Sequence, residues 1–144
     1  GECCKKITDA NRLCYRAQGV QTTESIVRAL GWKPERYSMA FQSRFGSQPW
    51  TQPYLDDHLK ELVNRGVKRV AVVTPSFVSD CLETIFEIGI EYREEFTAAG
   101  GDNFALVPNL NDDPAWFAAV YEIANKHLQA MPAAVDAAAI SDPA

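Results

Sequence analysis

The chain has 144 residues, a net charge of −5 and 23% charged residues, which is typical of one globular domain with its own core. Acidic and basic residues are mixed along the chain, so the charge argues against general affinity for nucleic acid or for an anionic membrane surface. No apolar run approaches the length of a membrane span.

The two ends and the cysteines bear on where the protein resides. Gly1 lies in a polar segment, so we read no signal peptide and interpret the chain as a piece of a longer protein. Cys3, Cys4, Cys14 and Cys81 are too few and too unevenly placed for a secreted disulfide scaffold. We therefore expect a reduced, cytoplasmic protein.

The N-terminal part alternates between helical and extended patterns. Residues 1–17 are polar, contain three cysteines and are predicted to be a loop or linker. A helical pattern over 18–30 ends at Gly31, a suitable C-terminal cap. Residues 37–42 alternate large apolar with small or polar side chains, which predicts a strand. The Gly-, Pro- and Ser-rich stretch 43–53 predicts a loop.

The remainder predicts a helix, a strand, a helix, a strand and a helix. These elements cover residues 55–63, 69–74, 80–98, 104–108 and 114–131. Gly66 ends the first of these helices, and Asp113 is the expected N-cap of the last. The apolar run 69–74 is typical of a parallel strand covered on both faces. Residues 132–144 are alanine-rich without periodicity and are predicted to be a disordered tail.

This alternation predicts the α/β class, with a Rossmann-like parallel sheet and helices on both faces. The domain would cover residues 18–131, between the linker and the tail. Three strands make a thin sheet, and the pattern opens with a helix. We therefore expect a first strand, of central position, to be missing from this chain.

Glu83, Glu87 and Glu91 lie four residues apart on the predicted helix, which stacks them in one column of carboxylates. Such like-charge pairs weaken a helix by a few tenths of a kcal/mol each. Spacing alone favours a solvated acidic face in which Asp80 caps the helix and Glu83 reaches back. The alternative is a site that binds a metal ion or moves protons. It gains weight because Glu83 lies beside Phe77 where a strand passes into a helix, the place of ligand crevices in parallel sheets.

Other residues near this switch complete the candidate site. Arg44 and Trp50 lie in the loop that follows residues 37–42, at the same predicted edge of the sheet. They are either ordinary loop packing or, with Phe77, flat walls and a cation for a planar anionic ligand. The predicted core face of the following helix consists of Leu82, Ile85, Phe86, Gly89 and Phe96.

Three blocks, at residues 41–50, 75–84 and 110–114, resemble the C-terminal half of ferrochelatase in order and spacing. The resemblance covers roughly residues 18–128. It implies a chelatase-type Rossmann-like domain that takes part in haem biosynthesis by inserting Fe²⁺ into protoporphyrin IX or coproporphyrin III, with release of two pyrrole protons. It also implies two partners, the porphyrin and the N-terminal half of the enzyme. A homodimer and peripheral association with a membrane are further expectations.

The resemblance assigns a role to each candidate residue. It makes Glu83 the catalytic carboxylate, Glu87 and Glu91 a metal or proton path, Trp50 and Phe77 walls of the porphyrin pocket, and Ser43 and Arg44 part of the loop that borders the pocket.

The chain also departs from the family pattern. The family's catalytic histidine strand has no match, because His58 and His127 lie on predicted helices outside such a motif. Position 81 is histidine in some members and Cys81 here, and Leu55 stands where many members have threonine. We therefore expect the chain alone to be inactive.

Cys3, Cys4 and Cys14 are similar to a linker that holds a [2Fe–2S] cluster in some bacterial ferrochelatases. A cluster of this kind needs four thiolates, and the position where those members place a further cysteine is Gly19. Free or partly oxidised cysteines are the alternative, and a zinc site lacks a fourth ligand of suitable spacing.

Two other functions remain open. One is a non-catalytic α/β binding or interaction domain that retains the chelatase fold and dimerises through an exposed sheet edge. The other is a flavodoxin-like domain, which is weakened because no phosphate-binding glycine loop follows any predicted strand.

Overall fold

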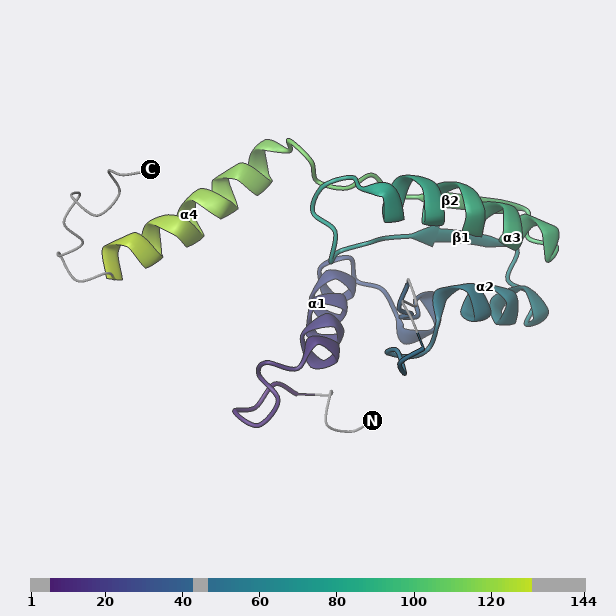
Figure 1. The fold of residues 1–144 in the computed structure, drawn as a ribbon, viewed down its shortest axis with the longest axis horizontal. Coiled ribbons are helices and arrows are strands. Elements are labelled where there is room, and N and C mark those ends of the chain that lie inside the picture. The colour runs from purple at the N-terminus through teal and green to yellow at the C-terminus, as the bar shows by residue number, and fades with distance from the viewer. Residues whose placement is uncertain (1–5, 43–46, 131–144) are drawn as a thin grey trace. The chain divides into compact units, whose positions relative to one another are not determined.

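The computed structural model describes residues 6–42 and 47–130. The chain divides into two compact units, Gly1–Asn109 and Leu110–Ala144. The first unit contains, in chain order, α1 (Tyr15–Ala29), η2 (Pro34–Arg36), α2 (Leu55–Asn64), β1 (Arg69–Val72), η3 (Glu83–Tyr92), α3 (Arg93–Ala98) and β2 (Asn103–Leu106). The second contains α4 (Pro114–Ala130). Figure 1 shows the two strands next to α2 and α3.

The sheet is parallel, as predicted, and has two strands in the described residues. β1 pairs with β2 from Arg69 opposite Asn103 to Val72 opposite Leu106. The prediction of a strand at residues 37–42 is wrong. Its backbone forms one isolated parallel bridge, between Phe41 and Tyr54, because it pairs with the chain just before α2 instead of with β1.

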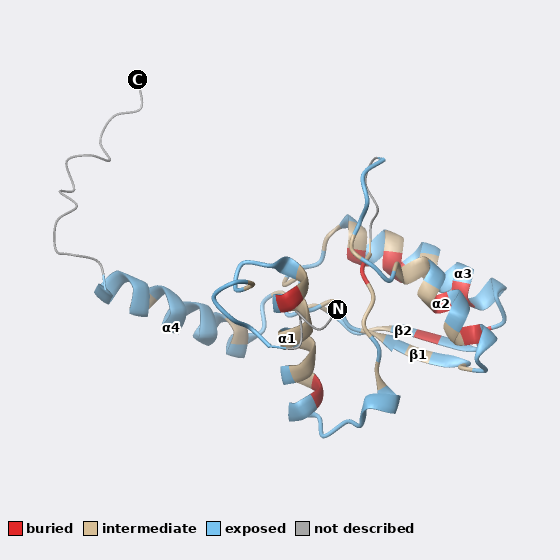
Figure 2. Cartoon of the chain, turned by 90° about the horizontal axis from the view of Figure 1, so that it is seen from below, coloured by how far each residue is buried: buried red, intermediate tan, exposed pale blue. Residues whose placement is uncertain are grey.

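The hydrophobic core lies between one face of the sheet and the helices α2, η3 and α3. It consists of Leu59, Val63, Ile88, Phe96 and Phe104, each at most 9% exposed, and Figure 2 shows its buried residues on these elements. The strand residues that alternate with the core side, Arg69, Ala71, Asn103 and Ala105, are exposed. The α/β class is therefore confirmed. The strand at 69–74 was expected to be covered on both faces. In the described part of this unit, only one face of the strand packs against the core.

Glycines end the first two long helices in the predicted places. Gly31 follows α1 with φ +64°, and Gly66 follows α2 with φ +86°, a conformation that glycine adopts without steric cost. Trp32 N–H donates to the carbonyl of Val27 and closes the C-terminal turn of α1. The start of α1 differs from the prediction, since the helix begins at Tyr15.

The helix after β1 is not the regular α-helix that was expected. η3 is a π-helix of 10 residues, and it passes into α3 without interruption. A π-helix bonds residue i to i+5 and usually occurs as a single turn at functional sites. Because it has more residues per turn, a different row of side chains faces the core. Of the predicted core residues, Gly89 and Phe96 are buried, whereas Leu82, Ile85 and Phe86 are 74%, 56% and 47% exposed. Thr84 and Ile88, which were not predicted, are buried as well.

The second unit is described by itself. Asp113 Oδ1 accepts a hydrogen bond from the Ala115 N–H at 2.8 Å, so the predicted N-cap is confirmed. Helical spacing predicts a buried stripe of Phe117, Val120, Tyr121, Ala124 and Leu128. This prediction is wrong, because α4 has no buried residue and both Phe117 and Leu128 are more than half exposed. Within residues 110–130, the described part of this unit, α4 has no other helix or strand to pack against. The predicted tail at 132–144 lies outside the described residues.

Candidate active site

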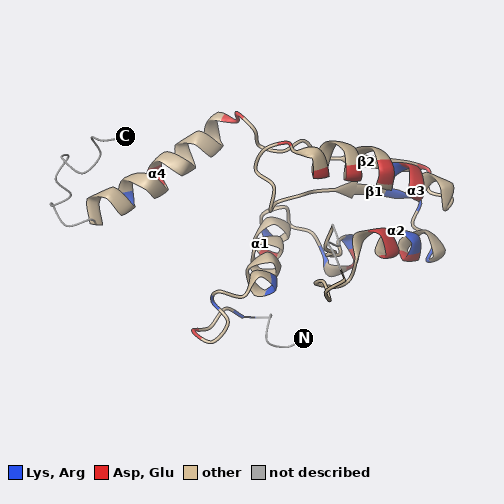
Figure 3. Cartoon of the chain, viewed as in Figure 1, with Lys and Arg blue, Asp and Glu red and all other residues tan. Residues whose placement is uncertain are grey.

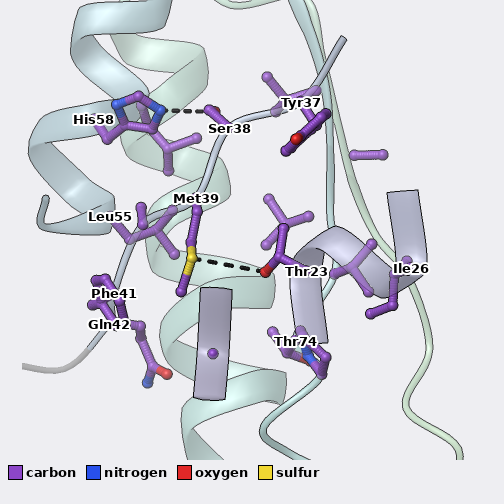
Figure 4. A pocket seen from close by; sticks show the side chains of 18 of the residues that line it. Thr23, Ile26, Tyr37, Ser38, Met39, Phe41, Gln42, Leu55, His58 and Thr74 are labelled. Atoms are coloured by element: carbon purple, nitrogen blue, oxygen red, sulfur yellow. Dashed lines mark hydrogen bonds between the residues drawn. The ribbon is translucent and has the colours of Figure 1, made fainter. Parts of the chain in front are cut away.

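A cavity of about 890 Å³ opens in the first unit. It is lined by α1, by residues 34–42 and 49–51, by one side of α2, by β1 with the segment that follows it, and by the start of η3. Figure 4 shows side chains from α1, from residues 37–42 and from α2 around it. Trp50, Phe77 and Glu83, three of the predicted site residues, all line this cavity. Its volume lies in the range of small-molecule and cofactor pockets.

A buried hydroxyl network holds the turn from which η3 starts. Thr84, which is 1% exposed, accepts a hydrogen bond from the Cys81 N–H at 3.0 Å and donates to the Cys81 carbonyl at 3.1 Å. Asn109 Nδ2 donates to the same hydroxyl at 3.4 Å, and Asn109 Oδ1 accepts from Thr74 Oγ1 at 2.7 Å. The ends of both strands are thus tied to the residue that follows Glu83.

This network replaces the predicted capping box. Leu82 occupies the N-cap of η3, without a side-chain cap hydrogen bond, so Asp80 is not the N-cap residue of this helix. The Cys81 N–H finds its acceptor on Thr84, inside the π-helix. A capping side chain that reaches forward to the first turn presumes α-helical geometry, which this turn does not have.

Glu83, the predicted catalytic carboxylate, lines the cavity, as does Glu35. Its own backbone N–H and then the Cys81 thiol donate to it, and together they hold the pKa of the Glu83 carboxyl below its ordinary value, although burial acts in the opposite direction. Glu83 is therefore ionised at neutral pH. The Cys81 thiol also lies 3.8 Å from Thr84 Oγ1, to which it donates a hydrogen bond.

The other two glutamates of the column differ from Glu83. Glu87 accepts a hydrogen bond from Tyr92 Oη at 2.6 Å and another from Gln42 Nε2 at 3.0 Å. Glu91 is exposed. Neither of the two lines the cavity among the described residues. Figure 3 shows the acidic bands along the helix that runs into α3. The metal or proton path through Glu87 and Glu91 stays a prediction.

The predicted walls are placed by short backbone contacts. Trp50, 40% exposed, donates its indole N–H to the Gln42 carbonyl at 3.2 Å. Phe77 is half-buried, and its N–H donates to the Thr74 carbonyl at 2.9 Å. Ser43 and Arg44, predicted to border the pocket, lie outside the described residues.

His58 is a cavity residue that sequence reasoning missed. Its Nε2 is hydrogen-bonded to Ser38 Oγ at 2.8 Å (Figure 4), and its Nδ1 lies 3.5 Å from Glu61 Oε2. Spacing could have placed it, because His58 follows Leu55 by three residues and precedes Leu62 by four, and both leucines line the same cavity.

The comparison with known families decides the class of protein. The sequence profile of the ferrochelatase family matches residues 3–128. The chain belongs to the ferrochelatase family. Ferrochelatases are metal chelatases of haem biosynthesis, so the resemblance read from the three sequence blocks is confirmed.

Bacterial ferrochelatases are among the similar proteins. That of Legionella pneumophila (strain Corby) is 44% identical over 125 residues, which cover 87% of this chain and 38% of the relative. That of Pseudomonas aeruginosa (strain LESB58) is 48% identical over 118 residues, which cover 82% of this chain and 35% of the relative. The chain thus spans little more than a third of the length of the ferrochelatases that it matches.

The cysteines of this ferrochelatase segment do not assemble a cluster site in the described residues. Cys14 is exposed at the N-cap of α1, while Cys3 and Cys4 lie outside the described residues. Within residues 6–42 and 47–130, no group of three or more His, Cys, Asp and Glu side chains is placed to hold a metal ion. A [2Fe–2S] cluster that involves Cys3, Cys4 and Cys14 stays a prediction. No helix in this part of the chain is long and apolar enough to cross a bilayer.

Proposed function

We propose that this chain contributes the glutamate side of a ferrochelatase active site, at which Fe²⁺ is inserted into protoporphyrin IX or coproporphyrin III and two pyrrole protons are released. The observation that carries the proposal is that Glu83, Phe77 and Trp50, which are distant in sequence, line one cavity. Its aromatic side chains suit the faces of a planar tetrapyrrole, and the Glu83 carboxylate lies among its polar groups.

Within this function, Glu83 handles charge at the porphyrin face. An ionised carboxylate attracts Fe²⁺ towards the ring and accepts a pyrrole proton once the metal displaces it. The lowered pKa of Glu83 favours the first role, because a weaker base holds a proton less tightly. Phe77 and Trp50 would hold the ring in the cavity, and Glu87 and Glu91 extend the acidic row behind Glu83.

The test uses a complete enzyme that carries these residues. This chain replaces the matching 118-residue segment of the Pseudomonas aeruginosa ferrochelatase, and iron insertion is followed by the absorbance of haem. Glu83→Gln should lower kcat by about 10²- to 10⁴-fold, the usual contribution of a positioned acid or base, while the porphyrin dissociation constant stays similar. Glu94→Gln, an exposed change on α3, is the matched control. Near-parental turnover of Glu83→Gln would contradict the assignment.

The same assay applies to the chain alone, which we propose to be inactive. Of its histidines, His58 is hydrogen-bonded to Ser38, and His127 Nδ1 lies 2.8 Å from the Ile123 carbonyl on α4. Neither stands in the motif of the family's catalytic histidine. Substantial haem formation by the purified chain would show that this histidine is dispensable. The non-catalytic alternative is tested by porphyrin titration, because a chain that leaves the Soret band unchanged keeps only the fold.

The proposal includes partners and a location. A two-stranded sheet is marginal by itself, so its edges favour pairing with further strands, either from the N-terminal half of a ferrochelatase or from a second copy. Peripheral membrane association and a cytoplasmic location complete this proposal. Light scattering of the chain, with and without the N-terminal part of a relative, distinguishes the two kinds of partner.

A further inference from the structure

Glu87 differs from a free carboxylate because both of its oxygens accept hydrogen bonds. Tyr92 Oη donates to Oε1 at 2.6 Å, and Gln42 Nε2 donates to Oε2 at 3.0 Å. All three side chains are half-buried. Hydrogen bonds to a charged acceptor are the stronger kind, and partial removal from water strengthens them further. These two hydrogen bonds fix the orientation of the Glu87 carboxylate from both of its oxygens.

Gln42 extends this set of contacts to the wall of the cavity. Its side chain binds Glu87 on η3, while its backbone carbonyl accepts the indole N–H of Trp50 at 3.2 Å. Gln42 and Trp50 both line the cavity. The contact between Gln42 and Glu87 joins segments that are 45 residues apart, so it holds the wall segment against the helix that carries Glu83.

We propose that Tyr92, Glu87 and Gln42 form a clamp that sets the position of Trp50 on the cavity wall relative to Glu83. In this arrangement Glu87 is a positioning residue, and its two side-chain oxygens hold the two donors. The clamp rests on the proposed function only for the identity of the ligand that Trp50 would contact.

The position of Trp50 is measured directly in the 144-residue chain labelled with 5-fluorotryptophan. The ¹⁹F resonance of Trp50 is identified by its loss in Trp50→Phe, and that of Trp116, in the second unit, serves as an internal reference. Gln42→Leu and Tyr92→Phe should each move the Trp50 resonance by more than its linewidth. Tyr121→Phe, which removes a hydroxyl from an exposed ring on α4, is the matched control.

Substitutions of Glu87 separate its shape from its charge. Glu87→Gln retains an oxygen for Tyr92, and a flipped Gln42 amide can present its own oxygen to the new amide nitrogen. We therefore expect Glu87→Gln to keep the Trp50 resonance near its parental position, and Glu87→Leu to move it. If the charge itself fixed the wall, both substitutions would move the resonance equally, which would overturn the role assigned to the clamp.

Porphyrin binding, followed at the Soret band, relates the clamp to function. Loss of one clamp hydrogen bond in Gln42→Leu should weaken porphyrin binding about two- to tenfold. Far-UV circular dichroism checks that each variant is folded. Because Gln42 lies outside the core, its variant decides the question if Tyr92→Phe does not fold. An unmoved Trp50 resonance in folded Gln42→Leu overturns the clamp. Failure of the parent to bind porphyrin contradicts the proposed function instead, while the resonance still tests the clamp.

Discussion

The packed core and the cavity share one helix but differ in how their side chains are covered. On the core side of η3, Ile88 and Thr84 are each 1% exposed, and Phe96 of α3 continues the same row at 0%. Towards the cavity, Glu83 is partly exposed and faces an opening of about 890 Å³. Along η3, residues four apart lie in one row. The row of Thr84 and Ile88 packs in the core, and the neighbouring row begins with Glu83 at the cavity. Stability and site chemistry should therefore respond to different substitutions on one element.

The largest effect should come from the core side. Phe96 packs against the ring of Phe104, with centroids 5.9 Å apart, and has no exposed surface. Phe96→Ala should lower the free energy of unfolding by about 3–5 kcal/mol, because it leaves a cavity in the core. Urea denaturation followed by circular dichroism measures this loss.

The control for this change lies on the cavity side. Phe77→Ala removes the same ring from a half-buried wall, so its loss of stability should be clearly smaller and its effect on porphyrin binding larger. Equal losses of unfolding free energy in Phe96→Ala and Phe77→Ala would show that the two sides are not separate in the way proposed.

Thr84 sharpens the comparison because it is buried in the core and adjacent to Glu83. Thr84→Val keeps the shape of the side chain but leaves the Cys81 N–H and Asn109 Nδ2 without their shared acceptor. We expect a loss of about 1–3 kcal/mol of unfolding free energy, the cost of unsatisfied buried groups. Thr97→Val, whose exposed hydroxyl donates to the Arg93 carbonyl on α3, is the control. If both variants lost equal stability, the Thr84 network would have no special role.

Local signals in the sequence predicted much of this fold and part of the site. The ends of α1 and α2 were predictable because glycine at positions 31 and 66 adopts the positive φ of a helix terminus. The parallel pairing of β1 and β2 follows from the alternation of helices and strands. The strand-to-helix switch and the loop after residues 37–42 indicate Glu83, Phe77 and Trp50, and the family blocks then assign their roles. The π-helix was missed because the prediction applied the α-helical period, although Thr84, Ile88, Tyr92 and Phe96 repeat at four residues, a spacing that drifts by about 40° per step in an α-helix.

Contacts between distant segments could not be predicted from local pattern. The bond between Gln42 and Glu87 spans 45 residues, and nothing near either residue indicates its partner. The same holds for the bond from Thr74 to Asn109, which joins the ends of two strands. The extended segment at 37–42 has the side-chain alternation of a strand, yet its backbone pairs with residues near Tyr54. Side-chain periodicity records which faces are apolar, and it leaves the backbone partner open.

The smallest predicted effect is a pH dependence of the unfolding free energy that comes from Tyr92, which follows the core row of η3 and bonds to Glu87 of the carboxylate row. Burial first, and then the hydrogen bond to Glu87, raise the pKa of the Tyr92 phenol above its ordinary value of 10.0. Above pH 10 the unfolded chain releases this proton while the folded chain retains it, so the contribution of Tyr92 to stability is complete below pH 10 and is lost as the pH rises. The difference in unfolding free energy between the parent and Tyr92→Phe should therefore be constant from pH 8 to about pH 10 and shrink above it.

Urea denaturation at a series of pH values measures this difference, and groups common to both proteins cancel in it. Because burial is the larger cause of the raised pKa, Glu87→Gln should remove only part of the loss above pH 10. The effect should be modest, since the phenol is partly exposed to solvent. A difference that stays constant up to pH 11 would mean that the phenol ionises alike in the folded and unfolded chains. The bond from Tyr92 to Glu87 would then be too weak to join the core row to the carboxylate row.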